Sequence, residues 1–324
     1  MKTTAAQLVA LARPKGALLI ASLPLVGFGF GLWDRGSTVH PKYVIGTLVA
    51  LFVAWVFGHA GAMWLNAVLD RDEGEVLLGE PVPVPRGTWL AGYLGVGASV
   101  GTAFLAGWPT ALCSATCAVL AVLYSHPRVA LKGRAFGGPL VNGVGYGILS
   151  PLGGWLAAAP VLTWRAVASI GLGAIFILGV YFAAQAFQAD EDRERGYRTL
   201  VATHGPQVTL WVARGCLVFV GLAMNGLALL GAYPRGVLVG LPLWFLMDRH
   251  LARWLRRGDG GRGSDATRLV GIVTLAVLLM LGATYAHQLH AILAHLPPGG
   301  CGTAVVPEAL AVICADPTYE PFIR

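Results

Sequence analysis

Long apolar runs alternate with short polar connections along almost the whole chain. About nine of these runs approach the roughly 17–25 residues that a helix needs to cross a bilayer. They lie at approximately 17–35, 43–66, 88–107, 109–125, 139–158, 167–188, 207–230, 236–250 and 267–290. The pattern predicts an all-α fold: a polytopic membrane bundle of about nine transmembrane helices, of which the eighth is short.

The basic residues predict how this bundle lies in its membrane. If the N-terminus faces the cytosol, 17 of the 23 Lys and Arg residues fall in cytosolic segments. This orientation is favoured because cytosolic loops carry an excess of Lys and Arg. We therefore expect one transmembrane domain over residues 1–292 and an extracytoplasmic tail over residues 293–324. A composition rich in Arg, Ala and Gly with little Lys favours the bacterial plasma membrane.

Composition agrees with a membrane protein and excludes one class of partner. The chain is 56% hydrophobic and 12% charged, with a mean hydropathy of +0.67, whereas soluble domains have about 25% charged residues. The net charge is +7, but the basic residues are spread over several loops. We therefore expect contact with membrane lipid and no binding of nucleic acid.

Acidic residues gather in two windows, each just after an apolar run. Five lie within 70–80 and four within 190–194, together nine of the sixteen in the chain. No Asp or Glu occurs between Glu80 and Asp190. Acids at two helix ends of a membrane protein are expected to hold cations, and bound cations imply an anionic substrate.

Helical phase selects particular residues in the first window. If the helix of run 43–66 continues, Asn66, Asp70 and Glu73 fall on one stripe of its surface. Asp72 lies about 120° away from that stripe unless Gly74 ends the helix early.

In the second window Gln185, Gln188 and Asp192 share a stripe about 60° wide, and Asp190 points elsewhere. Carboxylate and amide oxygens suit Mg²⁺, which takes one or two carboxylates together with phosphate oxygens of a substrate. Two such stripes facing each other predict a cytosolic site for a diphosphate bridged by Mg²⁺. The expected metal ligands are Asn66, Asp70, Asp72, Glu73, Gln188 and Asp192.

Basic residues are needed to complete such a site. Lys132 is the first candidate, since its loop lies between the two windows, and Arg128 and Arg198 follow. The alternative is that all these residues are ordinary charges of juxtamembrane loops. The paired arrangement of the two windows favours a functional site.

A few polar residues lie inside the apolar runs. His59 is seven residues before Asn66, on the same stripe but deeper, so it lines a cavity below the metal site or bonds to another helix. Asn142 and Tyr146 could line the same cavity or bond across helices. Arg214 could reach the site or extend toward the membrane surface.

These residues together resemble the UbiA superfamily of intramembrane prenyltransferases, over roughly residues 13–290. The matching residues are Arg13 and Pro14 for an Arg-Pro pair before the first helix, Asn66 and Asp70 for N-D-x-x-D-x-x-x-D, Tyr124, Ser125 and Lys132 for Y-S-x-x-P-x-x-x-K, and Asp192, Gly196 and Thr199 for the later part of D-x-x-D-x-x-x-D-x-x-x-G-x-x-T. No single match is decisive, but the set in this order is fairly specific.

The resemblance implies a helical bundle around a central cavity that opens to lipid. Mg²⁺ and an isoprenyl diphosphate would bind at the two motifs, and loss of diphosphate would give an allylic cation that a lipophilic or aromatic acceptor captures. Asn66, Asp70, Asp192 and Lys132 would be the catalytic residues. The expected substrate-binding residues are Tyr124, Arg128, Arg198, Gln185, Gln188, His59 and Asn142.

The chain departs from both family motifs. Ala67 and Gly74 stand where the first motif has Asp, and Gln185 and Gln188 stand where the second does. An amide can ligate Mg²⁺ but cannot act as a base. Some superfamily members with altered motifs cyclise the prenyl chain upon itself, so a terpene cyclase is the alternative. A third hypothesis is a transporter or a non-catalytic membrane protein, although a transporter would place more polar groups at mid-membrane.

Overall fold

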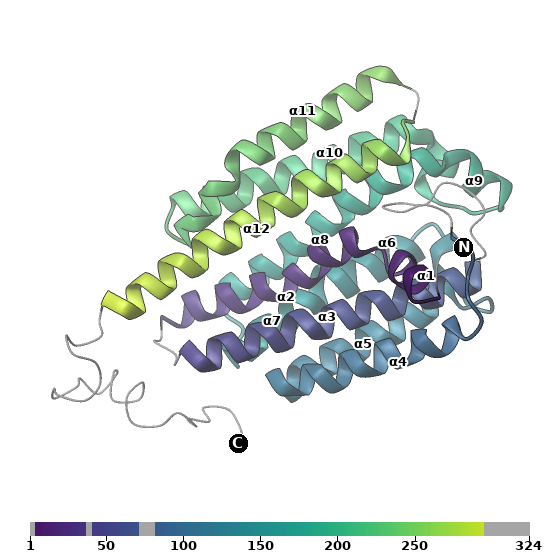
Figure 1. The fold of residues 1–324 in the computed structure, drawn as a ribbon. Helices are drawn as coiled ribbons and strands as arrows, with labels where there is room; N and C mark the ends of the chain where they lie inside the picture. Colours follow the sequence, from purple (N-terminus) through teal and green to yellow (C-terminus); the bar gives the residue numbers. More distant parts are fainter. Residues whose placement is uncertain (1–3, 37–40, 71–81, 259, 295–324) are drawn as a thin grey trace.

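The structure, a computed structural model, describes residues 4–36, 41–70, 82–258 and 260–294. In these ranges the chain is helical and contains no strand, which confirms the predicted fold class (Figure 1). The longer helices are α2 (Pro14–Arg35), α3 (Pro41–Asp70), α4 (Thr88–Ala103), α5 (Trp108–Ser125), α8 (Trp164–Gln185), α10 (Leu200–Leu229), α11 (Leu241–Arg257) and α12 (Gly263–Ala294). The shorter segments are α1 (Thr4–Leu11), η1 (Phe104–Ala106), η2 (Leu131–Gly133), α6 (Gly137–Asn142), η3 (Gly143–Leu149), α7 (Ser150–Ala158), η4 (Ala186–Gln188), α9 (Ala189–Glu194) and η5 (Arg235–Gly240).

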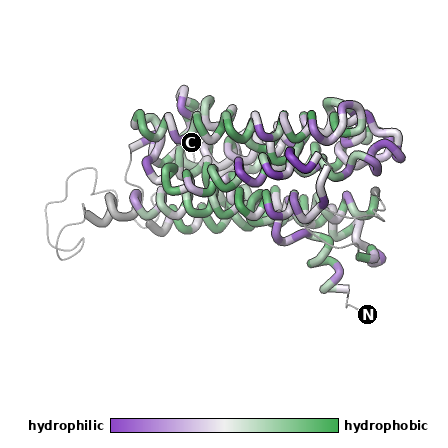
Figure 2. The backbone as a smooth tube through the Cα atoms, turned by 90° about the horizontal axis from the view of Figure 1, so that it is seen from above, coloured by the Kyte–Doolittle hydropathy of each residue, from purple (hydrophilic) through white to green (hydrophobic). Residues whose placement is uncertain are grey.

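Seven helices of the described part are long and apolar enough to cross a membrane, which makes this an integral membrane protein. They lie at Pro14–Arg35, Tyr43–Leu69, Thr88–Ala106, Trp108–Ser125, Trp164–Glu194, Leu200–Leu229 and Gly263–Gln288. Each coincides with one of the nine predicted spans. Figure 2 shows apolar residues along most of the length of these helices.

The predicted fifth and eighth spans are present in a different form. In place of one α-helix over 139–158, the chain forms α6, the π-helix η3 and α7 in direct succession. In place of an apolar helix over 236–250, it forms η5 and then α11, which has 17 residues and is polar in its second half. The predicted count of nine spans is therefore approximate, since two of them are not single long apolar α-helices.

The carbonyl group of Gly145 anchors the π-helix. It accepts hydrogen bonds from the backbone N–H and the Oγ of Ser150, the latter at 2.9 Å, and from Sγ of Cys117 at 3.4 Å. The same Ser150 Oγ accepts a bond of 2.7 Å from Nε1 of Trp55 on α3. These bonds fix the wider turn of η3 against α3 and α5, and Tyr146 on that turn faces the interior of the bundle.

Glycines bring neighbouring helices into backbone contact. A Cβ atom on Gly27 of α2 would meet the carbonyl oxygen of Pro151 on α7, and one on Gly154 of α7 would meet that of Pro24 on α2. Small residues of this kind are typical of membrane helix interfaces, where close packing replaces the hydrophobic effect. The α2–α7 contact consequently has no room for a larger side chain at either glycine.

An ion pair joins α10 to α11. Arg214 donates from Nε and Nη2 to the two carboxylate oxygens of Asp248, at 2.6 and 3.1 Å. Paired bonds of this form are among the stronger polar contacts in proteins. Arg214 does not line the central cavity. Of the two roles considered for its side chain, contact with the site is therefore wrong.

The two ends of the bundle differ. The N-terminus and α9 lie at one end in Figure 1, and the C-terminal end of α12 lies at the other. Residues 295–324 are outside the described part, so the predicted domain boundary at residue 292 and the extracytoplasmic tail remain predictions.

Candidate active site

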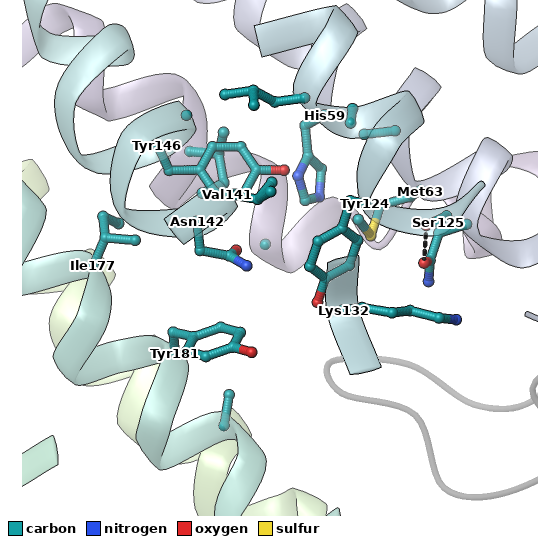
Figure 3. Close-up of a pocket in the computed structure, with 18 of the residues that line it drawn as sticks. His59, Met63, Tyr124, Ser125, Lys132, Val141, Asn142, Tyr146, Ile177 and Tyr181 are labelled. Atoms are coloured by element: carbon teal, nitrogen blue, oxygen red, sulfur yellow. Dashed lines mark hydrogen bonds between the residues drawn. The ribbon is translucent and has the colours of Figure 1, made fainter. Parts of the chain in front are cut away.

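A cavity of about 320 Å³ lies inside the bundle, near the end that carries α9. We call the group Asn66, Lys132, Gln188, Asp192 and Arg195 its polar end. Its inner part is bounded mainly by apolar and aromatic side chains, among them Trp55, Met63, Tyr146 and Ile177. Figure 3 shows several of these side chains converging on the open space. A space that is polar at one end and apolar beyond suits an amphiphilic ligand.

The first wall of the polar end comes from α3. The side chain of Asn66 lines the cavity, and its Oδ1 accepts a 2.7 Å hydrogen bond from Oγ of Ser125 at the end of α5; this is the dashed line in Figure 3. Asp70 is the last residue of α3, and its side chain is outside the described part of the chain. Asp72 and Glu73 are outside it as well, so their predicted role as metal ligands remains a prediction.

The second wall comes from the end of α8 and from η4 and α9. Gln185, Gln188 and Asp192 all line the cavity, as their helical phase predicts. Asp192 is only 8% exposed, and its Oδ2 accepts a 2.6 Å bond from Oγ1 of Thr199. By contrast, the side chain of Asp190 is 91% exposed and pairs with Arg193. Two acids that are two positions apart on α9 therefore have opposite surroundings. Substitution of one can serve as the control for substitution of the other.

The positive charge of Lys132 reaches the polar end from a connecting segment. Lys132 on η2 lines the cavity, with Nζ 5.9 Å from the centre of the Tyr197 ring. The backbone N–H of Arg198 donates to the carbonyl oxygen of Gly133 at 2.9 Å, which holds the two segments together. The side chains of Arg128 and Arg198 are not among those lining the cavity. Their predicted contact with substrate has no support from this geometry.

Three charged residues that helical phase did not select also line the cavity. Arg195 and Glu191 are both at the cavity and pair with each other at 2.7 Å. Glu191 lies about one turn and Arg195 about two turns after Gln188, both within about 60° of it, so the same 100° rule could have found them. Arg13, noted above only for its place before the first helix, lines the cavity too, with its backbone in the left-handed region at φ 49°.

The cavity lining as a whole carries more positive charge than negative within the described residues. Arg13, Lys132 and Arg195 are cationic, whereas Glu191 and Asp192 are anionic. No group of three or more His, Cys, Asp or Glu that could hold a metal occurs in the described ranges. One reason is that amides occupy positions 66, 185 and 188. This part of the site is therefore suited to an anion, and to a cation mainly through neutral oxygens.

Three polar groups lie deeper, among the apolar side chains. His59, Asn142 and Tyr146 line the inner part and come from three different elements, and Figure 3 shows them around the same space as Tyr124. Nδ2 of Asn142 donates to the carbonyl oxygen of Gly138 at 3.0 Å. For His59, neither ring nitrogen makes a hydrogen bond of standard geometry within the described part of the chain, so its alternative of a bond to another helix has no support.

Comparison with known proteins identifies the family. The sequence profile of the UbiA prenyltransferase family matches residues 22–262, about three quarters of the chain. The chain belongs to the UbiA prenyltransferase family. No curated protein matches it.

Several solved UbiA structures share the fold. A UbiA homologue from Archaeoglobus fulgidus bound to Cd²⁺ has a TM-score of 0.60 at 18% identity, and the match covers 86% of this chain and 99% of that one. A homologue from Aeropyrum pernix K1 has a TM-score of 0.61 at 19% identity and covers 84% and 98%. A digeranylgeranylglyceryl phosphate synthase structure has a TM-score of 0.56 at 13% identity and covers 89% and 99%. The Archaeoglobus fulgidus protein is also solved with GPP and Mg²⁺ and with DMAPP and Mg²⁺.

The UbiA motif positions of this chain gather at one cavity. Asn66 from the first motif, Lys132 from the loop between the motifs, and Gln185, Gln188 and Asp192 from the second all line it. These segments are far apart in sequence and meet only because α3 and α8 end at the same end of the bundle.

Proposed function

We propose that this protein is a membrane prenyltransferase that depends on Mg²⁺. It ionises an isoprenyl diphosphate and transfers the prenyl group to a lipophilic acceptor. The observation that carries the proposal is the polarity of the one cavity: cations and oxygen donors at the polar end, apolar and aromatic side chains beyond. A diphosphate and an isoprenyl chain differ in the same way.

The polar end fits a hard cation as well as a diphosphate. Carbonyl and carboxylate oxygens are the donors that Mg²⁺ prefers, and Asn66, Gln188 and Asp192 supply them. Thr199 binds one carboxylate oxygen of Asp192, so the other is available to a ligand. These three residues would hold the metal, with Asp70, Asp72 and Glu73 as further candidates. When bound, Mg²⁺ neutralises charge on the diphosphate. The Archaeoglobus fulgidus homologue with GPP and Mg²⁺ or DMAPP and Mg²⁺ supports this ligand class by analogy of fold.

The side chains of the chain itself would divide the remaining work. Lys132 and Arg195 bind phosphate oxygens and stabilise the negative charge that grows on the diphosphate as the C1–O bond breaks. The inner part keeps water away from the allylic cation. The faces of Tyr124, Tyr146 and Trp55 attract that cation, since aromatic rings carry negative charge on their faces.

A terpene cyclase is the second candidate, and one observation favours it. Gln185 and Gln188 replace two acids of the second motif, so these positions cannot take a proton from an acceptor. A cyclase needs no acceptor. We expect the active site to open to the cytosolic face of a bacterial plasma membrane, because most basic residues lie at that end of the predicted topology.

The test uses the two neighbouring acids of α9. Purified protein in lipid nanodiscs should release diphosphate from geranyl diphosphate when Mg²⁺ is present, and chelation should stop the release. Asp192→Asn should slow release on the order of 100-fold, since a stabilising contact in the transition state is lost. Asp190→Asn, two residues away and exposed, should stay close to wild type.

Equal effects of the two substitutions would sink the site assignment. Product analysis separates the two candidate functions. A cyclic hydrocarbon or alcohol formed without any added acceptor favours the cyclase, whereas a prenylated acceptor favours the transferase.

A further inference from the structure

His59 is a buried imidazole whose ring nitrogens lack a hydrogen bond of standard geometry in the described part of the chain. It is 7% exposed, lines the inner part of the cavity, and neither ring nitrogen makes a hydrogen bond to any described residue. Arg13 is close to the ring: its backbone approaches the imidazole without a hydrogen bond of standard geometry, and its positive charge acts on the ring. Figure 3 shows the ring projecting into the space between Tyr146 and Tyr124. Buried polar groups of native proteins are nearly always paired, so an unpaired one facing a cavity points to a ligand that pairs with it.

A hydrocarbon chain cannot be that partner. An isoprenyl group carries no hydrogen-bond donor or acceptor, and a cyclisation of that group would leave both nitrogens unpaired. A second substrate with a hydroxyl group would satisfy one of them. Tyr146, on the π-helix, lines the same inner part. The inner part therefore offers two sites of polar contact among apolar side chains.

The other groups that could take a proton have different partners. Asp192 accepts a hydrogen bond from Thr199 and keeps its other carboxylate oxygen for the metal proposed above, and Glu191 pairs with Arg195. Gln185 and Gln188 are amides and cannot act as bases. Among the described residues at the cavity, His59 is the base that neither a protein hydrogen bond nor the proposed metal occupies.

The position of His59 on α3 also suits contact with an acceptor. His59 and Asn66 are seven residues apart on α3, which places them about 10 Å apart along the helix axis and on the same face. One aromatic ring or a short alcohol fits between a diphosphate-bearing carbon at the polar end and the imidazole. We propose that His59 binds the hydroxyl group of the acceptor and takes its proton during prenyl transfer.

The C1–O bond of the isoprenyl diphosphate breaks and its electron pair leaves with the diphosphate. A bond forms between C1 and the acceptor, at the hydroxyl oxygen or, in a phenol, at a ring carbon conjugated with it. In the second case the C–H proton of that ring carbon is then lost to water and the oxygen is protonated again, which restores the aromatic ring. The O–H proton passes to a ring nitrogen of His59, and the resulting imidazolium later returns it to water. The substrate class is thus a hydroxyl-bearing lipophile. This inference rests on the proposed function.

The experiment measures how captured cation divides between acceptor and water. Geranyl diphosphate is supplied with Mg²⁺ and a series of 4-substituted phenols, from 4-alkylphenols to 4-nitrophenol, which is already largely ionised near neutral pH. For His59→Gln and His59→Phe, the products formed are compared whatever the rate of diphosphate release. With 4-alkylphenols they should lower the ratio of prenylated phenol to prenyl alcohol by roughly 100-fold, as expected for a lost general base. With 4-nitrophenol the loss should shrink to a few-fold.

A second histidine provides the control, and different outcomes contradict the inference and the proposed function. His204→Gln changes an exposed histidine of α10 and should behave as wild type with every phenol. An equal loss across the whole series would mean that His59 only shapes the cavity, and no loss would mean that it takes no part; either result overturns the inference. Diphosphate release by wild type without prenylation of any phenol would overturn the hydroxyl acceptor. Absence of diphosphate release by wild type would instead overturn the proposed function.

Discussion

At the scale of single residues, hydrogen-bond partners decide what each polar group can do. Asn66 and Asp192 each accept one bond from a neighbouring hydroxyl group and keep further lone pairs for a ligand. Ser150 instead has both its hydroxyl functions occupied inside the protein, by Trp55 and by Gly145. The first two are therefore candidates for chemistry, whereas Ser150 is part of the support.

Ser150→Ala tests that support. The substitution leaves the indole N–H of Trp55 without an acceptor in a buried site, and an unpaired buried group costs about 1–3 kcal/mol. We expect a lower midpoint of thermal unfolding in detergent. Thr116→Ala is the matched control, because this hydroxyl bonds only to the carbonyl of Leu112 on an exposed face. A midpoint for Ser150→Ala equal to that of the control would contradict the assigned role.

Helical phase located some of the site residues and missed others for physical reasons. Gln185, Gln188 and Asp192 lie on one face because η4 and α9 continue the helical path of α8. Arg195 could have been included by extending that phase by one turn. The exclusion of Arg128 and Arg198 from the cavity could not have been foreseen, since both lie in connecting segments whose course depends on contacts such as Arg198 N–H to Gly133.

At the scale of elements, helix contacts in this bundle depend on missing side chains. Gly27 and Gly154 bring the backbones of α2 and α7 together. Gly46 on α3, by contrast, has nothing within 4 Å of the position of a Cβ atom. The sequence shows many glycines, 44 in all, but it does not show which of them are in contact.

Gly154→Ala should therefore disturb the α2–α7 contact. The added methyl group collides with the backbone of Pro24, and overpacking typically costs about 1–3 kcal/mol. Gly46→Ala should be neutral or stabilising by up to about 1 kcal/mol, because alanine favours the helix. Unfolding by denaturant in mixed micelles measures both. Equal stability of the two variants would refute the contact.

The π-helix shows where pattern reading fails at this scale. The apolar run 139–158 predicts one regular helix, and its hydropathy contains no signal for η3. The wider turn depends on the donors around the Gly145 carbonyl, which come from Ser150 and from Cys117 on another helix. Such a feature is set by tertiary contacts.

At the scale of the whole molecule, the sequence predicts the helical architecture well, because lipid leaves the backbone few alternatives to helices. The seven long apolar helices all coincide with predicted spans. The sequence predicts the residues that line the polar cavity less well than it predicts the helices. The positive-inside rule further predicts which end of the bundle faces the cytosol.

Labelling of single cysteines tests this orientation. In a variant without the native cysteines, Asp190→Cys should react with a membrane-impermeant maleimide only after cells are opened. Arg235→Cys, exposed between α10 and α11, should react in intact cells. Reversed labelling would contradict the cytosolic active site while leaving the fold unaffected.

The π-helix also bears on how relatives of this chain are compared. A turn of this kind holds about one residue more than an α-helical turn. Each later residue therefore faces about 100° away from its direction in a regular α-helix of the same length. Tyr146 reaches the cavity and Gly154 reaches α2 with that rotation in place. A relative that is one residue shorter within 143–149 and forms a regular α-helix there presents the same later positions on the same faces. In an alignment, a single gap at this point is therefore the expected sign of a relative without the wide turn.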